Sequence, residues 1–164
     1  MAAKATTGKK AGGDDRKIVA ENRRARHDFH IIETYEAGMA LVGTEVKALR
    51  GGTVTISDAY VRVDGGKAEL IGMTIPQYTF GNINNHQTDR TRALLLHKKE
   101  IAELEVHVTR KGNTIVPLRI YFLGGKAKLE IAVAKGKDKG DKRQAIAERD
   151  TKRQIDREFK SRQQ

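Results

Sequence analysis

The 164-residue chain contains no cysteine, and this absence excludes a disulfide framework and a zinc site built on thiolates. It also lacks a run of about 18 apolar residues, the length that a membrane-spanning helix needs. The first 17 residues have no apolar segment of the kind found in secretory signals. Together, these absences predict a soluble, cytoplasmic protein.

Apolar side chains are scarce, at 38% of all residues, and aromatic residues make up only 5%. This content is low for a chain that is ordered throughout, but it suffices for a core of about a hundred residues. We therefore expect one domain at residues 18–135, preceded by a disordered arm at residues 1–17 and followed by a basic tail at residues 136–164.

Motifs that assemble a catalytic site are missing as well. The chain has no HExxH, GxSxG or P-loop pattern, and its five histidines and its carboxylates are scattered. The glycine pairs at 51–52, 65–66 and 124–125 indicate turns, because none lies between a strand and a helix at the spacing of a phosphate loop. We predict that the protein is not an enzyme and that it holds no metal and no cofactor.

What the chain has in excess is positive charge, with a net charge of +11. Residues 1–26 hold 8 Lys and Arg against 3 Asp and Glu, residues 27–135 hold 14 against 12, and residues 136–164 hold 10 against 6. Basic ends on a nearly neutral domain favour a nucleic-acid partner, since neutralised phosphates release counterions. Solubility alone is the alternative. A membrane surface is disfavoured, because neither end has an apolar face with aromatic anchors.

Alternating apolar residues predict about six short strands: one at 27–38, a hairpin around Asp64-Gly65-Gly66, one at ALLLH (93–97), and two around Gly124-Gly125. Helical spacing at 39–52 and 98–113 predicts two helices, with Thr44 as an N-cap of the first and Gly112 just after the end of the second. Residues 74–91 form a long loop. The fold class is mainly β with flanking helices, and a small barrel of the oligonucleotide-binding type fits it, although an open α+β sandwich is also compatible.

The tail divides into two parts. KGKDKGDK (135–142) is dense in charge and broken by glycine, which predicts no fixed structure, whereas residues 141–160 contain helix formers without Gly or Pro. Ile146 is out of phase with Ile155 and Phe159, so no continuous apolar stripe can dock on the domain. We expect a tail that is unstructured alone and helical when a polyanion neutralises it.

The segment ENRRARHDFH (21–30) is the first candidate binding site. Its arginines and its asparagine suit RNA phosphates and base edges, and its histidine and phenylalanine offer stacking surfaces. A solvated run of charges is the alternative, but the segment leads directly into the first predicted strand. We expect Arg23, Arg24 and Arg26 to contact phosphate and include His27 in the same site.

Several motifs in order carry a resemblance: ENRRARHDFHIIETYEAGMALVGTEVKALRGG, SDAYVRV, RTRALLLHKKEI, GNTIVPLRIYF and AVAKGKDKGDKR. From about Val19 to Arg143 the chain closely resembles the bacterial SsrA-binding protein family, also called small protein B. The resemblance implies an oligonucleotide-binding-type barrel that binds the tRNA-like domain of transfer-messenger RNA (tmRNA). It also implies trans-translation: delivery of alanyl-tmRNA, together with elongation factor Tu, to stalled ribosomes. From the lack of an apolar surface helix we expect a monomer.

The resemblance also implies site residues. Asn22, Glu36 and Leu95 match family positions on the tmRNA-binding surface, Glu36 as a hydrogen-bond partner of a base or ribose or as a residue that orients an arginine. In the tail, Lys135 and Lys137 lie in AKGK, and Asp141, Lys142 and Arg143 form the DKR motif. These motifs imply contact with small-subunit ribosomal RNA at the decoding centre, with the tail helix in the empty mRNA channel. We expect Asp141 to cap that helix.

Three positions depart from the family pattern. Gly140 precedes DKR where the family often has a histidine or an aromatic residue, Asp138 replaces a lysine, and Ala93 stands where Lys or Arg is common. These departures put a stacking contact at the decoding centre and one phosphate contact in question. Two rival functions are a basic structural ribosomal protein and a nucleic-acid-processing enzyme on a similar barrel.

Overall fold

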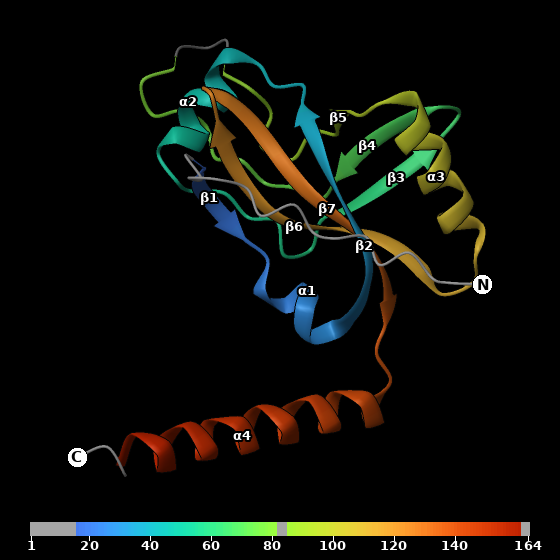
Figure 1. The fold of residues 1–164 in the computed structure, drawn as a ribbon. Coiled ribbons are helices and arrows are strands. Elements are labelled where there is room, and N and C mark those ends of the chain that lie inside the picture. Colours follow the sequence, from blue (N-terminus) through green and yellow to red (C-terminus); the bar gives the residue numbers. More distant parts are fainter. Residues whose placement is uncertain (1–15, 82–84, 162–164) are drawn as a thin grey trace.

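A computed structural model describes residues 16–81 and 85–161, and it shows a curled β-sheet with helices around it (Figure 1). The strands are β1 (Lys17–Glu21), β2 (Phe29–Met39), β3 (Tyr60–Asp64), β4 (Lys67–Ile71), β5 (Arg92–Leu95), β6 (Asn113–Leu123) and β7 (Lys126–Gly136). The helices are α1 (Arg23–Asp28), α2 (Gly43–Arg50), α3 (Lys98–Thr109) and α4 (Lys139–Ser161).

The strands form one sheet in the order β1-β6-β7-β2-β5-β4-β3, and neighbouring strands are antiparallel. β3, at one end of this order, packs against β6, which lies next to the other end. The sheet therefore curls into a small barrel. The predicted mainly β fold with flanking helices is confirmed, but the described residues contain seven strands and four helices instead of about six and two.

Both predicted tight turns are present, at Gly65-Gly66 and at Gly124-Gly125. The four glycines have φ values between 55° and 75°. A two-residue hairpin turn needs positive φ at both central positions, and glycine adopts it without steric cost. These turns set the β3–β4 and β6–β7 registers.

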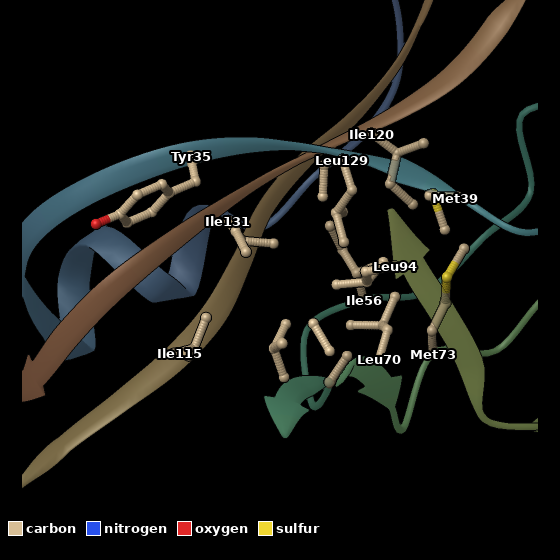
Figure 2. Close-up of a cluster of buried hydrophobic side chains, with 14 of the residues drawn as sticks. Tyr35, Met39, Ile56, Leu70, Met73, Leu94, Ile115, Ile120, Leu129 and Ile131 are labelled. Atoms are coloured by element: carbon tan, nitrogen blue, oxygen red, sulfur yellow. The ribbon is translucent and has the colours of Figure 1, made fainter. Parts of the chain in front are cut away.

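The core lies inside the curl of the sheet, where apolar residues of β2, β4, β5, β6 and β7 meet (Figure 2). Ile120, Leu129 and Ile131 come from the long strands, and Leu70 and Leu94 face them from β4 and β5. All five are buried. Burying each such side chain contributes about 1.5–3 kcal/mol, so these positions dominate the stability of the barrel.

A second, smaller apolar cluster lies under α1. Ala25 of α1 packs with Val116, Leu118, Ala132 and Ala134 of β6 and β7. Three of these five side chains are alanines, which allows the backbone of α1 to approach the sheet closely. The cluster fixes α1 on the barrel.

β1 and α1 were not predicted. Lys17 belongs to β1, so the predicted disordered arm ends earlier than expected; residues 1–15 of that arm lie outside the described residues. Pairing of Lys17 with Phe122 and of Glu21 with Arg119 holds β1 on β6. The sequence signal for α1 was Asn22, a good N-cap residue, and its side chain accepts a hydrogen bond from Ala25 N.

Two predicted helix boundaries were wrong in detail. Val42, not Thr44, is the N-cap of α2, and its N–H donates to the Glu45 side chain at 3.0 Å. The C-cap of α3 is Arg110, so Gly112 comes one residue later than predicted, with φ +87° in the turn into β6. In both cases the helix is where the apolar spacing indicated, and only its cap differs.

The tail forms one continuous helix, α4, which begins three residues after the end of β7. Figure 1 shows it beneath α1 and apart from the sheet. The irregular segment predicted for residues 135–142 is thus only Lys137 and Asp138, because β7 runs to Gly136 and the helix includes Gly140. Strong helix formers account for this order. None of the helices in the described residues is long and apolar enough to cross a membrane.

Candidate nucleic-acid interface

Three arginines on α1 form an exposed cationic surface. Ala25 faces the sheet, so Arg23, Arg24 and Arg26 project into solvent around it. The Arg23 side chain is 90% exposed, and the Glu21 carboxylate is 3.7 Å away. Ion pairs this exposed contribute little and leave guanidinium groups available to phosphate.

Asn22 does not lie on this surface. Its side chain is buried, with Oδ1 accepting from Ala25 N at 3.2 Å and Nδ2 donating to Pro117 O at 3.1 Å. Its own backbone N–H donates to Leu118 O at 2.7 Å. The predicted RNA-binding residue is therefore built into the junction of α1 and β6, where it positions the neighbouring arginines.

Glu36 and Leu95 line one cleft, of about 680 Å³. The cleft lies between β2, β5, the start of α3 and the β6–β7 turn, and Lys126 and Lys128 contribute its cationic side chains. Leu95 is 62% exposed. Its close approach to β2 depends on Gly38, where an added Cβ would be 3.2 Å from Leu95 Cβ. The structure thus brings together two predicted residues that are far apart in sequence.

The Glu36 carboxylate is held by two neighbours. Tyr121 donates its phenolic O–H to Glu36 Oε2, and Lys128 Nζ is 3.7 Å from Oε1. Burial, reinforced by the hydrogen bond to Glu36, raises the pKa of the Tyr121 phenol, so Tyr121 stays a hydrogen-bond donor at neutral pH. The Glu36 carboxylate is thus placed by Tyr121 and lies beside Lys128, and its predicted contact with a base or ribose, or with an arginine, stays a prediction.

The predicted tail residues gather at the base of α4. Lys137 N donates to Asp28 O at 2.9 Å, and Lys137 Nζ donates to Arg26 O at 3.2 Å. Lys142 Nζ is 3.5 Å from Asp28 Oδ1. The first turn of α4 is thus tied to the end of α1, next to the cationic surface. Lys135, on β7, and Arg143, on α4, are exposed to solvent.

Asp141 has a different partner from the one expected. It lies inside the first turn of α4, so it is not the N-cap, and its Oδ2 is 3.2 Å from His30 Nε2. The hydrogen bond with His30 holds the pKa of the Asp141 carboxyl below its usual value. A negative charge in the first turn also interacts favourably with the helix dipole.

His27 forms a hydrogen bond with the adjacent Asp28. Its Nδ1 lies 2.9 Å from Asp28 Oδ1, and this hydrogen bond, with the charge of Lys142, lowers the pKa of Asp28. His27 belongs to a helix and His30 to the following strand. The sequence prediction placed both histidines in one strand and was wrong on this point.

Sequence reasoning did not identify Asp28, His30, Lys126 and Lys128 as members of these sites. Lys128 stands in a strand whose alternation marks it only as outward-facing, and Lys126 follows a turn. Asp28 and His30 meet Lys142 and Asp141 across more than a hundred residues of sequence. No local spacing signals such contacts. Within the described residues, no group of three or more His, Asp or Glu is placed to hold a metal ion.

An antiparallel barrel with an exposed arginine surface, a cleft edged by lysines and a basic helix projecting from it defines a nucleic-acid-binding class of protein. Comparison with known proteins identifies the family within this class. The family model described as "SmpB protein" matches residues 19–161. The chain belongs to the SmpB family.

Curated relatives bear the name SsrA-binding protein. One from Leifsonia xyli subsp. xyli is 55% identical over 146 residues, which is 89% of this chain and 92% of the relative. One from Thermobifida fusca is 49% identical over 92% of this chain and 94% of the relative. One from Desulforamulus reducens is 49% identical over 99% of both chains. The rival of a structural ribosomal protein finds no support in these relatives.

A solved structure shares the fold. A chain from the structure described as "tmRNA-SmpB: a journey to the center of the bacterial ribosome" superimposes with a TM-score of 0.63 at 46% identity. The match covers 77% of this chain and 93% of that chain.

Proposed function

We propose that the chain is a non-enzymatic RNA-binding adaptor for trans-translation, which binds the tRNA-like domain of tmRNA and delivers alanyl-tmRNA to stalled ribosomes. Membership of the SmpB family carries this proposal, because relatives named SsrA-binding protein match nearly the whole chain, tail included. The solved structure of a tmRNA–SmpB complex, 46% identical in its SmpB-like chain, supports the same partners.

The barrel supplies two surfaces for the tRNA-like domain. The arginines of α1 suit phosphate, which positions an RNA without reading its sequence. The cleft of Glu36 and Leu95 suits unstacked nucleotides, since it combines apolar and hydrogen-bonding side chains with two lysines. We assign tmRNA binding to both surfaces, with Asn22 acting through α1.

The tail has a separate task on the ribosome. Its large apolar residues Ile146, Ile155 and Phe159 remain at least 45% exposed, so α4 contributes no core to the barrel. We propose that this helix enters the mRNA channel only when no message fills it, so that the tail distinguishes stalled from translating ribosomes. Lys137, Lys142 and Arg143 at its base then face small-subunit ribosomal RNA at the decoding centre.

Further partners follow from the proposed task. We propose that elongation factor Tu joins by way of the tmRNA complex, as it would with an aminoacyl-tRNA. We propose that the chain is a monomer and acts in the cytoplasm, where ribosomes translate.

Competition binding tests the proposal. The purified chain is titrated against the isolated tRNA-like domain of tmRNA at physiological salt, with bulk tRNA in excess. Binding that survives the competitor is expected. If bulk tRNA displaces the tRNA-like domain, the chain is a generic basic RNA binder and the adaptor function fails. Salt dependence alone does not separate these outcomes, because every phosphate-binding protein shows it.

A further inference from the structure

A second cavity, of about 380 Å³, lies between α1 and the loop that leads into β3. We name it the α1 pocket. Arg24 and Phe29 line it on one side, Asp58 and Tyr60 on the other, and Val116 of β6 lies among the apolar residues between them. None of these residues lines the cleft of Glu36 and Leu95.

The pocket offers a flat apolar surface next to polar groups. Tyr60, at the edge of the pocket, is 46% exposed, although tyrosine rings are usually more deeply buried. Phe29 is half-buried and belongs to the apolar cluster under α1. An exposed aromatic ring beside an apolar floor is a stacking surface for an unpaired base.

Two charged groups meet at the mouth of the pocket without satisfying each other. Arg24 Nη1 is 3.9 Å from Asp58 Oδ1, too long for a hydrogen bond, and the two side chains are 72% and 85% exposed. Asp58 would repel a phosphate, but it accepts hydrogen bonds from a base. Among the bases, guanine offers two adjacent donors, N1–H and the N2 amino group, to one carboxylate. Arg24 remains available for the phosphate of the same nucleotide.

Both walls are held in place before any ligand binds. On one side, buried Asn22 ties α1 to Pro117 O. On the other, Gly72 approaches so closely that an added Cβ would be 3.0 Å from Asp58 O, and the neighbouring Ala59 is buried. The carboxylate is therefore exposed on a rigid loop, as a preorganised recognition group requires.

We propose that the α1 pocket binds one unpaired guanine of an RNA partner, with the base stacked on Tyr60, its Watson–Crick edge on Asp58 and its phosphate near Arg24. This inference rests on the proposed function, since it deepens the RNA-binding role of α1. The guanine comes either from the tRNA-like domain of tmRNA or from small-subunit ribosomal RNA, and the experiment distinguishes the two sources.

Kethoxal probing tests the pocket directly, because kethoxal reacts with guanine at N1 and N2, the two positions that Asp58 would cover. The full chain is bound to the isolated tRNA-like domain in one arm and to small ribosomal subunits in the other. We expect one unpaired guanine to be protected by the wild type, with protection lost in Asp58→Ala and Tyr60→Leu but retained in Tyr60→Phe. Affinity for that RNA should fall about tenfold in Tyr60→Leu, the scale of one lost base stack.

Asp64→Ala, which removes an exposed carboxylate at the far end of β3, is the matched control and should leave protection unchanged. The arm that shows the Asp58-dependent guanine identifies the source. If neither RNA contains a guanine whose protection depends on both Asp58 and Tyr60, the pocket proposal is wrong. The proposed function is judged separately, by the overall affinity of the wild type for the tRNA-like domain.

Discussion

The barrel and the tail helix are ordered by different forces. The barrel buries a continuous apolar cluster and even a fully buried ion pair, Glu45 with Arg92. α4 has no such core: its large apolar side chains are exposed, and two residues of its first turn, Asp141 and Lys142, contact His30 and Asp28. The barrel therefore specifies its own shape, whereas the tail depends on local helix propensity and on the surface that it contacts.

The largest effect on stability is expected from the buried ion pair. Arg92 Nε donates to Glu45 Oε1 at 2.9 Å and Arg92 Nη1 to Met73 O at 2.7 Å. Arg92→Met leaves a buried carboxylate and a buried carbonyl with fewer donors, so urea unfolding should show a loss of about 3 kcal/mol. Arg62→Met, which removes an exposed pair with Glu69, should be indistinguishable from wild type. If Arg92→Met and Arg62→Met lowered the free energy of unfolding equally, the buried ion pair would not be the larger contributor to stability.

The second largest loss of stability is expected from substitutions at the junction of the barrel and α1. Asn22→Ala removes an N-cap and leaves Pro117 O without its donor, so we expect a loss of about 1–2 kcal/mol. Affinity for the tRNA-like domain should fall as well, because the arginines of α1 are no longer held in position. Asn22→Asp keeps the N-cap acceptor but sets a buried carboxylate oxygen against Pro117 O, so it should be at least as destabilising as Asn22→Ala. A fall in affinity without a fall in stability would instead make Asn22 a direct RNA contact.

The strands of the barrel could be predicted from the sequence, whereas α1 and the contacts between distant residues could not. Short apolar runs bounded by turn residues predicted β2 to β7. Strict alternation fails in β6 and β7, because these strands are buried on both faces, by the barrel core and by α1. α1 was missed because it has only six residues, and of these Ala25 alone is buried. The surfaces were predicted in part: the exposed arginines follow from composition, and Glu36 and Leu95 from the resemblance. The partners of Asp28 and His30 are set by tertiary contacts and leave no local pattern.

The contact between the tail and α1 should weaken at acid pH. Hydrogen bonding lowers the pKa of both Asp28 and Asp141 below the usual 3.8, the first through His27 and the second through His30. A depressed pKa means that the stabilisation is complete above pH 3.8 and is lost as the pH falls through the lower native value.

The backbone amide of Lys137, which donates to Asp28 O, reports this contact. Its NMR shift should titrate below pH 3.8 while the Leu94 amide, in the barrel, stays constant. In Asp28→Asn with Asp141→Asn the titration should disappear. If the Lys137 amide shift still titrated in the double variant, a group other than Asp28 and Asp141 would be responsible.

The smallest effect is expected within α4. Gly140 is helical, and an added Cβ there would meet no atom within 4 Å outside the helix backbone, so Gly140→Ala should stabilise the helix by up to about 1 kcal/mol. Far-UV circular dichroism should show more helix, while the unfolding midpoint of the barrel stays the same. Ala147→Gly should do the opposite. A change in the barrel midpoint would show that the two regions are coupled beyond the first turn of α4.

If the barrel binds tmRNA and the tail acts only on the ribosome, deletion of residues 141–164 should separate the two functions. The truncated chain is assayed for affinity toward the tRNA-like domain and for peptide tagging in reconstituted translation of a message without a stop codon. We predict unchanged affinity and abolished tagging. Loss of tmRNA binding, or tagging that continues without the tail, would contradict the account.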